Sequence, residues 1–280
     1  MPRNVVLNEL RRGPAIWTVP LFLGGFGMVW TQQPEVSRWS QWSTTTLYAL
    51  NAALFGAVVL VFTLATWQAG RERRHRVTEL FGSTPRPRLQ RALAVWLPTL
   101  AWPLLVYVPV ALVLGVTTTQ AATGPPLLGL LATVVPMLAV YAALGFVIGW
   151  YVPGRLTAFV APVVFYFAMF QLAARVPQEL LITVPELSIW AYGDEPGIEV
   201  WEHPVWWFAP VAAVWFAGLA AALLTLTARR RRWLAAVPLA AAVLAAVPIV
   251  NSQEWHAGTP APGMVCESDL LPACPPGRSR

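Results

Sequence analysis

Residues 70–88 read GRERRHRVTELFGSTPRPR, a polar stretch between two long apolar segments. Counted together with Arg91, the stretch carries seven arginines. Residues 71–81 contain no proline or glycine, and apolar side chains recur there at helical spacing, so that they form a short stripe. The stripe consists of Val77, Leu80 and Phe81. We therefore predict a short amphipathic helix over residues 71–81.

The residues after this predicted helix carry the signals of a turn and of a new helix. Gly82 is typical of the position that follows a helix, because glycine adopts a left-handed backbone conformation without strain. Thr84 followed by Pro85 is typical of an N-cap and a first helical residue. The stretch therefore predicts a sharp turn and a second helix that enters a membrane. The alternative interpretation is a generic basic loop that only obeys membrane topology.

Composition indicates that most of the chain lies in a membrane. Hydrophobic residues make up 57% of the 280 residues and charged residues 11%, whereas a soluble domain has roughly 25% charged residues. The 15 tryptophans suit a protein with many membrane–water boundaries. All 19 basic residues are arginines. The absence of lysine excludes a conventional P-loop ATPase and an enzyme that uses a Schiff-base lysine.

Seven apolar segments are candidates for membrane spans, which need roughly 17 to 25 residues. They cover 14–30, 47–67, 92–115, 127–152, 156–172, 205–227 and 233–250. Only a three-residue turn separates the fifth segment from the fourth, so a re-entrant hairpin is an alternative there. Residues 1–13 are basic and predict an interfacial amphipathic helix, with a signal peptide as the alternative. We therefore predict an all-α polytopic membrane protein.

The placement of arginine predicts how the chain is oriented in the membrane. If the amino end lies inside, 15 of the 19 arginines fall on the inner side, including Arg155 and all those of the loop 70–91, and ten of the 13 acidic residues fall on the outer side. We expect a multi-pass protein of the plasma (inner) membrane with a cytoplasmic amino end and an extracytoplasmic tail. The net charge of +6 then requires no nucleic-acid partner. The basic run 229–232 anchors this topology, and anionic lipid binding is a second interpretation of it.

The predicted outer parts of the chain are the loop 173–204 and the tail 251–280. Apolar and acidic residues are interleaved in the loop, which fits either a lid over an exit path or a solvated loop with interfacial tryptophans. The tail contains both cysteines of the chain, Cys266 and Cys274. An oxidising outer compartment favours a disulfide between them. A metal site is disfavoured, because no histidine lies close to either cysteine in the sequence.

The sequence contains no pattern of a catalytic site, and we do not expect an enzyme. The three histidines are scattered, and neither a His-Glu-x-x-His zinc motif nor a Gly-x-Ser-x-Gly elbow is present. No acidic residue, arginine or histidine lies within the seven apolar segments, which argues against a proton-coupled transporter. In the fourth segment, Gly145 and Gly149 form a pattern of small residues that favours close helix packing, within the chain or between subunits.

The polar stretch also carries a family resemblance. Glu72, the Glu-Leu-Phe run at 79–81 and the Ser-Thr-Pro run at 83–85 occur in this order before a basic residue. This order resembles the first cytoplasmic loop of permeases of the ABC type-2 exporter family, the coupling helix that docks on an ATPase subunit. The chain departs from many members at Arg76, where they have a small residue. The resemblance implies these partner-binding residues: Arg71, Glu72, Val77, Glu79, Leu80, Phe81 and Thr84.

The resemblance further implies the architecture of the chain. It implies a six-helix permease-like bundle over 14–227, with a cytoplasmic coupling loop at 70–91 and an outer loop at 173–204. The basic loop and seventh transmembrane helix at 228–250 and the tail at 251–280 are departures from the family pattern.

The function implied by the resemblance is that of the permease subunit of an ATP-driven exporter, which moves an amphiphilic substrate. A separate ATPase subunit would bind ATP-Mg, and this chain would hold no cofactor. A second permease copy or a paralogue would complete the transporter. The alternative is a non-transporting membrane anchor, or an assembly or sensory protein, whose outer tail binds a partner.

Overall fold

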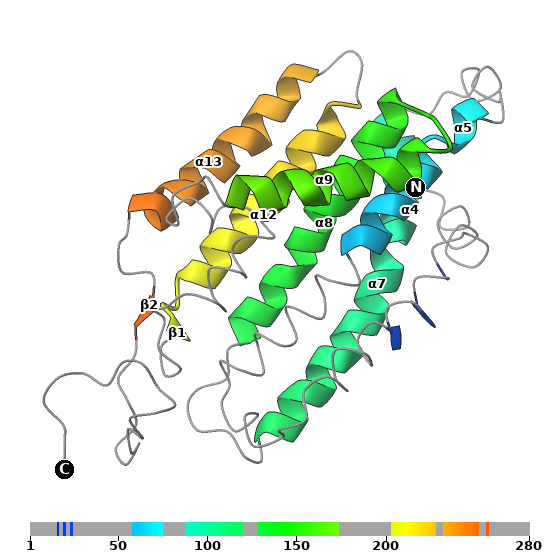
Figure 1. Ribbon diagram of the computed structural model, residues 1–280. Helices are drawn as coiled ribbons and strands as arrows, with labels where there is room; N and C mark the ends of the chain where they lie inside the picture. The colour runs from blue at the N-terminus through cyan, green and yellow to red at the C-terminus, as the bar shows by residue number, and fades with distance from the viewer. Residues whose placement is uncertain are drawn as a thin grey trace, which may run out of the picture.

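The computed structural model describes residues 16, 19–20, 23–24, 58–74, 88–119, 128–173, 203–227, 232–251 and 256–257. In this part of the chain, helices account for nearly all regular structure (Figure 1). The elements are α4 (Val59–Ala69), α5 (Arg71–Arg74), α7 (Arg88–Thr119), α8 (Leu128–Tyr151), α9 (Thr157–Ala173), β1 (His203–Pro204), α12 (Phe208–Thr225), η4 (Arg232–Ala235), α13 (Ala236–Asn251) and β2 (His256–Ala257).

Three of the described helices are long and apolar enough to cross a membrane. These stretches are Leu89–Val110 in α7, Ala132–Tyr151 in α8 and Phe208–Thr225 in α12. Shorter apolar helices cover Val59–Ala69, Thr157–Ala168 and Trp233–Pro248. The described part is therefore that of a helical membrane protein, as the composition predicts. The six-helix bundle with a seventh span stays a prediction.

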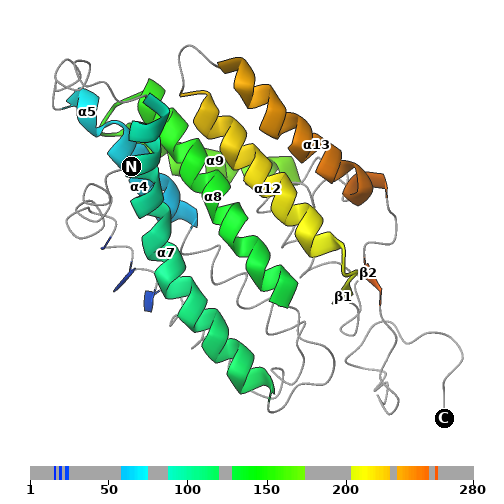
Figure 2. The same cartoon turned by 180° about the vertical axis from the view of Figure 1, so that it is seen from behind.

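The helix α8 lies at the centre of the described bundle. It packs most extensively against α12 and α4, and α12 packs in turn against α13 (Figures 1 and 2). Among the three long helices, α8 is the most deeply buried. The long helix α7 has fewer neighbours and contains three prolines, each of which removes a backbone hydrogen bond. The last predicted span, α13, is thus packed on the bundle through α12.

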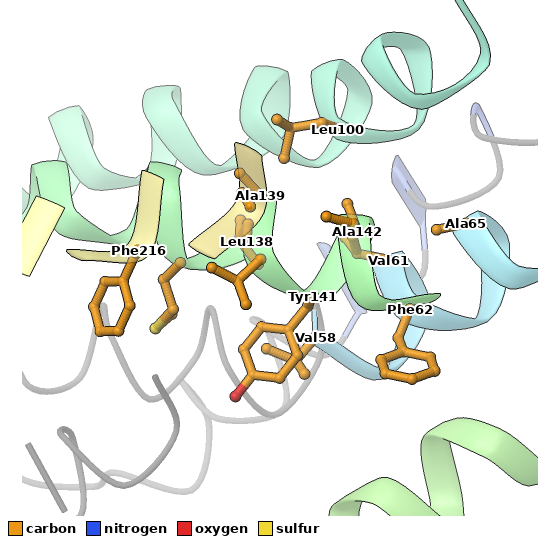
Figure 3. Packing of buried hydrophobic residues seen from close by; sticks show 14 of the residues in the cluster. Val58, Val61, Phe62, Ala65, Leu100, Leu138, Ala139, Tyr141, Ala142 and Phe216 are labelled. Carbon is orange, nitrogen blue, oxygen red and sulfur yellow. The ribbon is translucent and has the colours of Figure 1, made fainter. Parts of the chain in front are cut away.

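The core consists of buried side chains from α4, α7, α8 and α12 (Figure 3), and partly buried side chains of α9 pack against it. Phe62 of α4 and Tyr141 of α8 are among its most deeply buried side chains. The Phe165 ring of α9 contacts both, with ring centroids 5.4 Å from Phe62 and 5.8 Å from Tyr141. Tilted and edge-on aromatic pairs at these separations add to the packing energy. This aromatic cluster therefore joins three helices.

Glycines allow the helices to approach each other closely at two contacts. A Cβ at Gly145 of α8 would lie 2.5 Å from the Phe62 carbonyl oxygen of α4, and a Cβ at Gly149 would overlap the Thr66 backbone. A Cβ at Gly218 of α12 would lie 2.7 Å from the Pro238 carbonyl oxygen of α13. Small residues permit such backbone-to-backbone packing between membrane helices. The structure thus places Gly145 and Gly149 at a contact within the chain.

The two ends of the bundle differ in charge. The segments that carry the described arginines meet at one end (Figure 1), which we call the arginine end; these arginines are Arg71, Arg73, Arg74, Arg88, Arg91, Arg155 and Arg232. Contacts between the turn after α8 and the end of α4, and between Tyr151 and Leu226 at the ends of α8 and α12, bring these segments together. At the opposite end, β1 and β2 form an antiparallel pair (Figure 1). This pair joins the end of the predicted outer loop to the predicted outer tail.

The helix α9 is arranged differently from the long helices. It begins at the arginine end and runs across the bundle, whereas α7, α8, α12 and α13 run alongside one another (Figures 1 and 2). It contacts α4 more than α8, although only a short turn connects it to α8. Its side chains Phe159, Val160, Val163, Val164 and Phe167 are exposed. The fifth predicted span is therefore a helix that lies crosswise.

Candidate functional site

Several of the sequence-predicted site residues lie outside the described residues: Val77, Glu79, Leu80, Phe81, Thr84, Cys266 and Cys274. Arg71 and Glu72 lie in α5, which covers the first four residues of the predicted helix over 71–81. The coupling-helix roles and the disulfide stay predictions. The described site is the junction where α4 passes into α5, at the arginine end.

The junction is built around Gly70. Its backbone N–H donates to the Thr66 carbonyl at 3.3 Å, and its own carbonyl accepts from the Arg74 N–H at 3.1 Å. The chain thus turns from α4 into α5 without an intervening loop. A Cβ on Gly70 would lie 2.5 Å from Arg74 Nη1 and 3.3 Å from Pro153 Cα. The absence of a side chain therefore lets a guanidinium and the turn after α8 meet at the end of α4.

Arg74 is held against the last turn of α4. Its guanidinium carbon lies 4.4 Å from the centroid of the Trp67 ring, and its Nη2 donates a hydrogen bond to the Trp67 carbonyl oxygen. A cation over an indole face is attracted by the ring quadrupole, and the hydrogen bond satisfies one of the carbonyls left free at the end of a helix. Arg74 therefore holds α5 against α4 through two contacts, both of them with Trp67.

A second arginine lies close to this junction. Arg155 is exposed in the turn between α8 and α9, two residues after Pro153. Burial, and then the positive charge of Arg155, lower the pKa of Arg74. Arginine stays protonated in proteins despite such effects, so both side chains are cations. The fold thus holds two like charges near each other, which favours an anion beside them.

The arginine end has an excess of positive charge. In the described part of the chain, seven arginines occur with a single acidic residue, Glu72. The Nη1 atom of Arg74 is buried and has no hydrogen-bond partner in this part of the chain. These observations give the site the character of an anion-binding surface.

Two features of this region were missed in the sequence. One is the contact of Arg74, which lies in the predicted inner loop, with Trp67, the last residue of the predicted span before it. The other is Gln68, a buried side chain of α4 whose amide nitrogen and oxygen lack hydrogen-bond partners among the described residues. The position of Gln68, directly after an apolar segment that ends at residue 67, could have indicated a polar side chain at the end of this helix. The common inner-side assignment of the loop 70–91 and of Arg155 was the signal for the arginine pair.

At the opposite end, two histidines lie in the short strands β1 and β2. The β1–β2 register pairs His203 with Ala257 and Pro204 with His256. Among the described residues, no group of three or more potential metal ligands is found.

Comparison with known protein families, with curated proteins and with solved structures finds no match for this chain. The function is therefore inferred from the charge distribution, the packing and the stretch 70–88 alone. The contact of Arg74 with α4 and the glycine contact between α4 and α8 are the structural features from which that inference starts.

Proposed function

We propose that this chain is the permease subunit of an ATP-driven ABC exporter of the type-2 class. It moves an amphiphilic substrate across the plasma membrane with energy from a separate ATPase subunit, which binds ATP-Mg. The observation that carries the proposal is the junction at Gly70. The segment with the coupling-loop sequence begins as helix directly at the end of α4, and Arg74 fixes it there.

This junction supports a mechanical link from the loop 70–91 to the centre of the bundle. A force on α5 acts on α4 through Arg74 and Trp67. From α4 it acts on α8 at Gly145 and Gly149, where the backbones of the two helices touch. Close-packed contacts transmit displacement because they do not yield. A movement of the loop would therefore displace α8, which packs against most of the other described helices.

A helix that can bend would complete an alternating-access cycle. The three prolines of α7, at 98, 103 and 109, each leave a carbonyl one turn earlier without its helical hydrogen bond. Thr99 is buried within this region, and its hydroxyl donates to the Val95 carbonyl at 3.0 Å. Because α7 packs on its neighbours less extensively than α8, bending it disturbs fewer contacts. We assign the movable wall of the substrate path to α7.

The proposal also requires a second permease copy or a paralogue in the membrane. Apolar side chains are exposed on α13 and on α9, including Leu244 and Phe167. In a bilayer such faces contact lipid or another membrane subunit without cost. The charge distribution fits the predicted orientation, in which the amino end lies inside. The arginine end would then face the cytoplasm, where the ATPase and its nucleotide lie.

The test is capture of the ATPase by the tagged chain in mild detergent, with mass spectrometry to identify it. Truncating a packed anchor typically costs about 2 kcal/mol or more of binding free energy, which is roughly a thirtyfold loss of affinity. We expect Phe81→Ala and Glu79→Arg to lose the ATPase at that level. Arg73→Gln is the matched control, because Arg73 is exposed on α5 and exposed charges contribute little.

The control for folding is the expression level and membrane insertion of each variant. If the Phe81 and Glu79 variants retain the ATPase as well as the parent chain does, the exporter proposal fails. A non-transporting membrane anchor would then explain the chain better.

A further inference from the structure

The arginine end carries a second feature beside the Arg74–Arg155 pair, namely the exposed apolar start of α9. Leu156 lies between Arg155 and the first residue of α9 and is 76% exposed, and Phe159, one turn later, is 60% exposed. The Phe159 ring also contacts Trp67 edge-on, with ring centroids 6.2 Å apart. The apolar surface of α9 therefore begins at the same tryptophan on which Arg74 stacks.

The apolar surface continues along α9 away from the arginines. Val160, Val163, Val164 and Phe167 recur at helical spacing and are all more than half exposed. Because this spacing places them along one side of a helix, they form a continuous apolar strip. One end of the strip is cationic and the rest is uncharged, which is the complement of an anionic amphiphile.

Two arginines, Arg74 and Arg155, form the cationic end of the strip close to Gly70. Arg74 Nη1 and Pro153 Cα both lie within 3.3 Å of the position that a Gly70 Cβ would occupy, and Arg155 follows Pro153 by two residues. Glu72 is the single acidic residue in the described part of the chain. Guanidinium groups pair well with phosphate oxygens, since their donors match the spacing of two acceptors.

We propose that an anionic phospholipid binds at this place, with its phosphate paired to the exposed Arg155, with the positive charge of Arg74 beside it, and with an acyl chain along the exposed strip of α9. The apolar strip distinguishes a lipid from other ligands of similar charge. A free phosphate would leave the apolar side chains unused, and an acidic protein loop would have to leave the membrane surface to cover them. A lipid uses both parts at once. This inference does not depend on the exporter proposal, because it needs only the membrane and the described residues.

The test is native mass spectrometry of the full chain after incorporation into nanodiscs that contain phosphatidylglycerol and phosphatidylcholine in equal amounts. The parent chain should retain phosphatidylglycerol preferentially. Arg155→Gln and Arg74→Gln should each lower that preference about fivefold, the equivalent of roughly 1 kcal/mol per basic residue near an anionic surface. Arg73→Gln is the matched control and should change it little, because Arg73 is exposed on the same helix as Arg74.

Three outcomes would overturn the inference. The parent chain could show no preference for phosphatidylglycerol. Arg73→Gln could reduce the preference as much as Arg155→Gln, in which case only the general excess of charge attracts the lipid. Excess inorganic phosphate could displace the bound lipid completely, in which case the site holds phosphate without the acyl chain. Arg155→Gln keeps the test valid if Arg74→Gln does not fold, because Arg155 lies exposed in a turn.

Discussion

The adjacent helices α8 and α9 are both apolar, and yet they occupy opposite environments. The α8 helix is the buried centre of the bundle, whereas much of α9 is exposed. They differ in how closely a neighbouring helix approaches them and in how much of their surface is left exposed. In α8, Gly145 and Gly149 let the backbone of α4 approach, whereas α9 exposes bulky residues such as Phe159 and Phe167. Hydrophobicity alone therefore does not separate a central helix from a peripheral one in this protein.

The largest expected effect contrasts one phenylalanine from each environment. Phe62 of α4, which packs at the α8 contact, is 1% exposed, and Phe167 of α9 is 66% exposed. Removing a fully buried phenylalanine leaves a cavity that costs about 3 kcal/mol or more. We expect Phe62→Ala to lower the free energy of unfolding by that amount and Phe167→Ala by less than about 0.5 kcal/mol.

The measurement is reversible unfolding of each purified variant in detergent, followed by circular dichroism. Equal losses for Phe62→Ala and Phe167→Ala would mean that another part of the molecule covers α9. That part would be a second subunit or a segment outside the described residues. The contrast between the two helices would then be wrong.

A smaller effect is expected at the contact that makes α8 central. Gly149→Ala places a methyl group into the Thr66 backbone of α4, which cannot move without shifting the helix. Overpacking of this kind typically costs about 1–3 kcal/mol. Gly24→Ala is the matched control, because a Cβ at Gly24 meets no atom within 4 Å. We expect a loss of stability at Gly149 only, measured by the same unfolding assay. If Gly149→Ala is as stable as the parent chain, α4 and α8 do not pack as closely as described.

The sequence predicted the helices of this bundle better than their arrangement. The fourth apolar segment, 127–152, corresponds closely to α8, Leu128–Tyr151, because a long apolar run ended by proline and glycine fixes both limits. The crosswise direction of α9 was not predicted. Apolar side chains satisfy the lipid as well as the interior, so hydropathy does not distinguish the two. The helix that packs on Gly145 and Gly149 was likewise not predictable, because the pattern of small residues indicates a close contact but does not identify the other helix.

The candidate site was predictable only in part. The arginine count placed the loop 70–91 and Arg155 on one side of the membrane, and the structure brings Arg74 and Arg155 to one end of the bundle. The stacking of Arg74 on Trp67 was not predictable, because it depends on the space left by Gly70 after α4 has packed. The roles of residues 77–84 stay predictions, since they lie outside the described residues.

The smallest expected effect repeats the glycine substitution at the arginine end, where the neighbouring atoms differ. A Cβ at Gly70 meets Arg74 Nη1 at 2.5 Å, which is the far end of a flexible side chain, and Pro153 Cα at 3.3 Å. The backbone of Gly70 has φ −79° and ψ −7°, a conformation that alanine adopts without strain. Alanine also restricts the unfolded chain, which stabilises a protein by about 0.4–1 kcal/mol. We expect Gly70→Ala to change the unfolding free energy by less than about 0.5 kcal/mol, because this gain offsets the displacement of Arg74.

A double-mutant cycle separates the two opposing effects. In an Arg74→Ala background, the guanidinium no longer has to move, so Gly70→Ala should be more stabilising there than in the parent chain. The difference between the two backgrounds measures the coupling of Gly70 to Arg74, which for residues in contact is about 0.5 kcal/mol or more. A coupling near zero, together with a loss at Gly70 as large as that at Gly149, would place the rigid contact at Pro153. The turn after α8, and not Arg74, would then hold α4 in position at the arginine end.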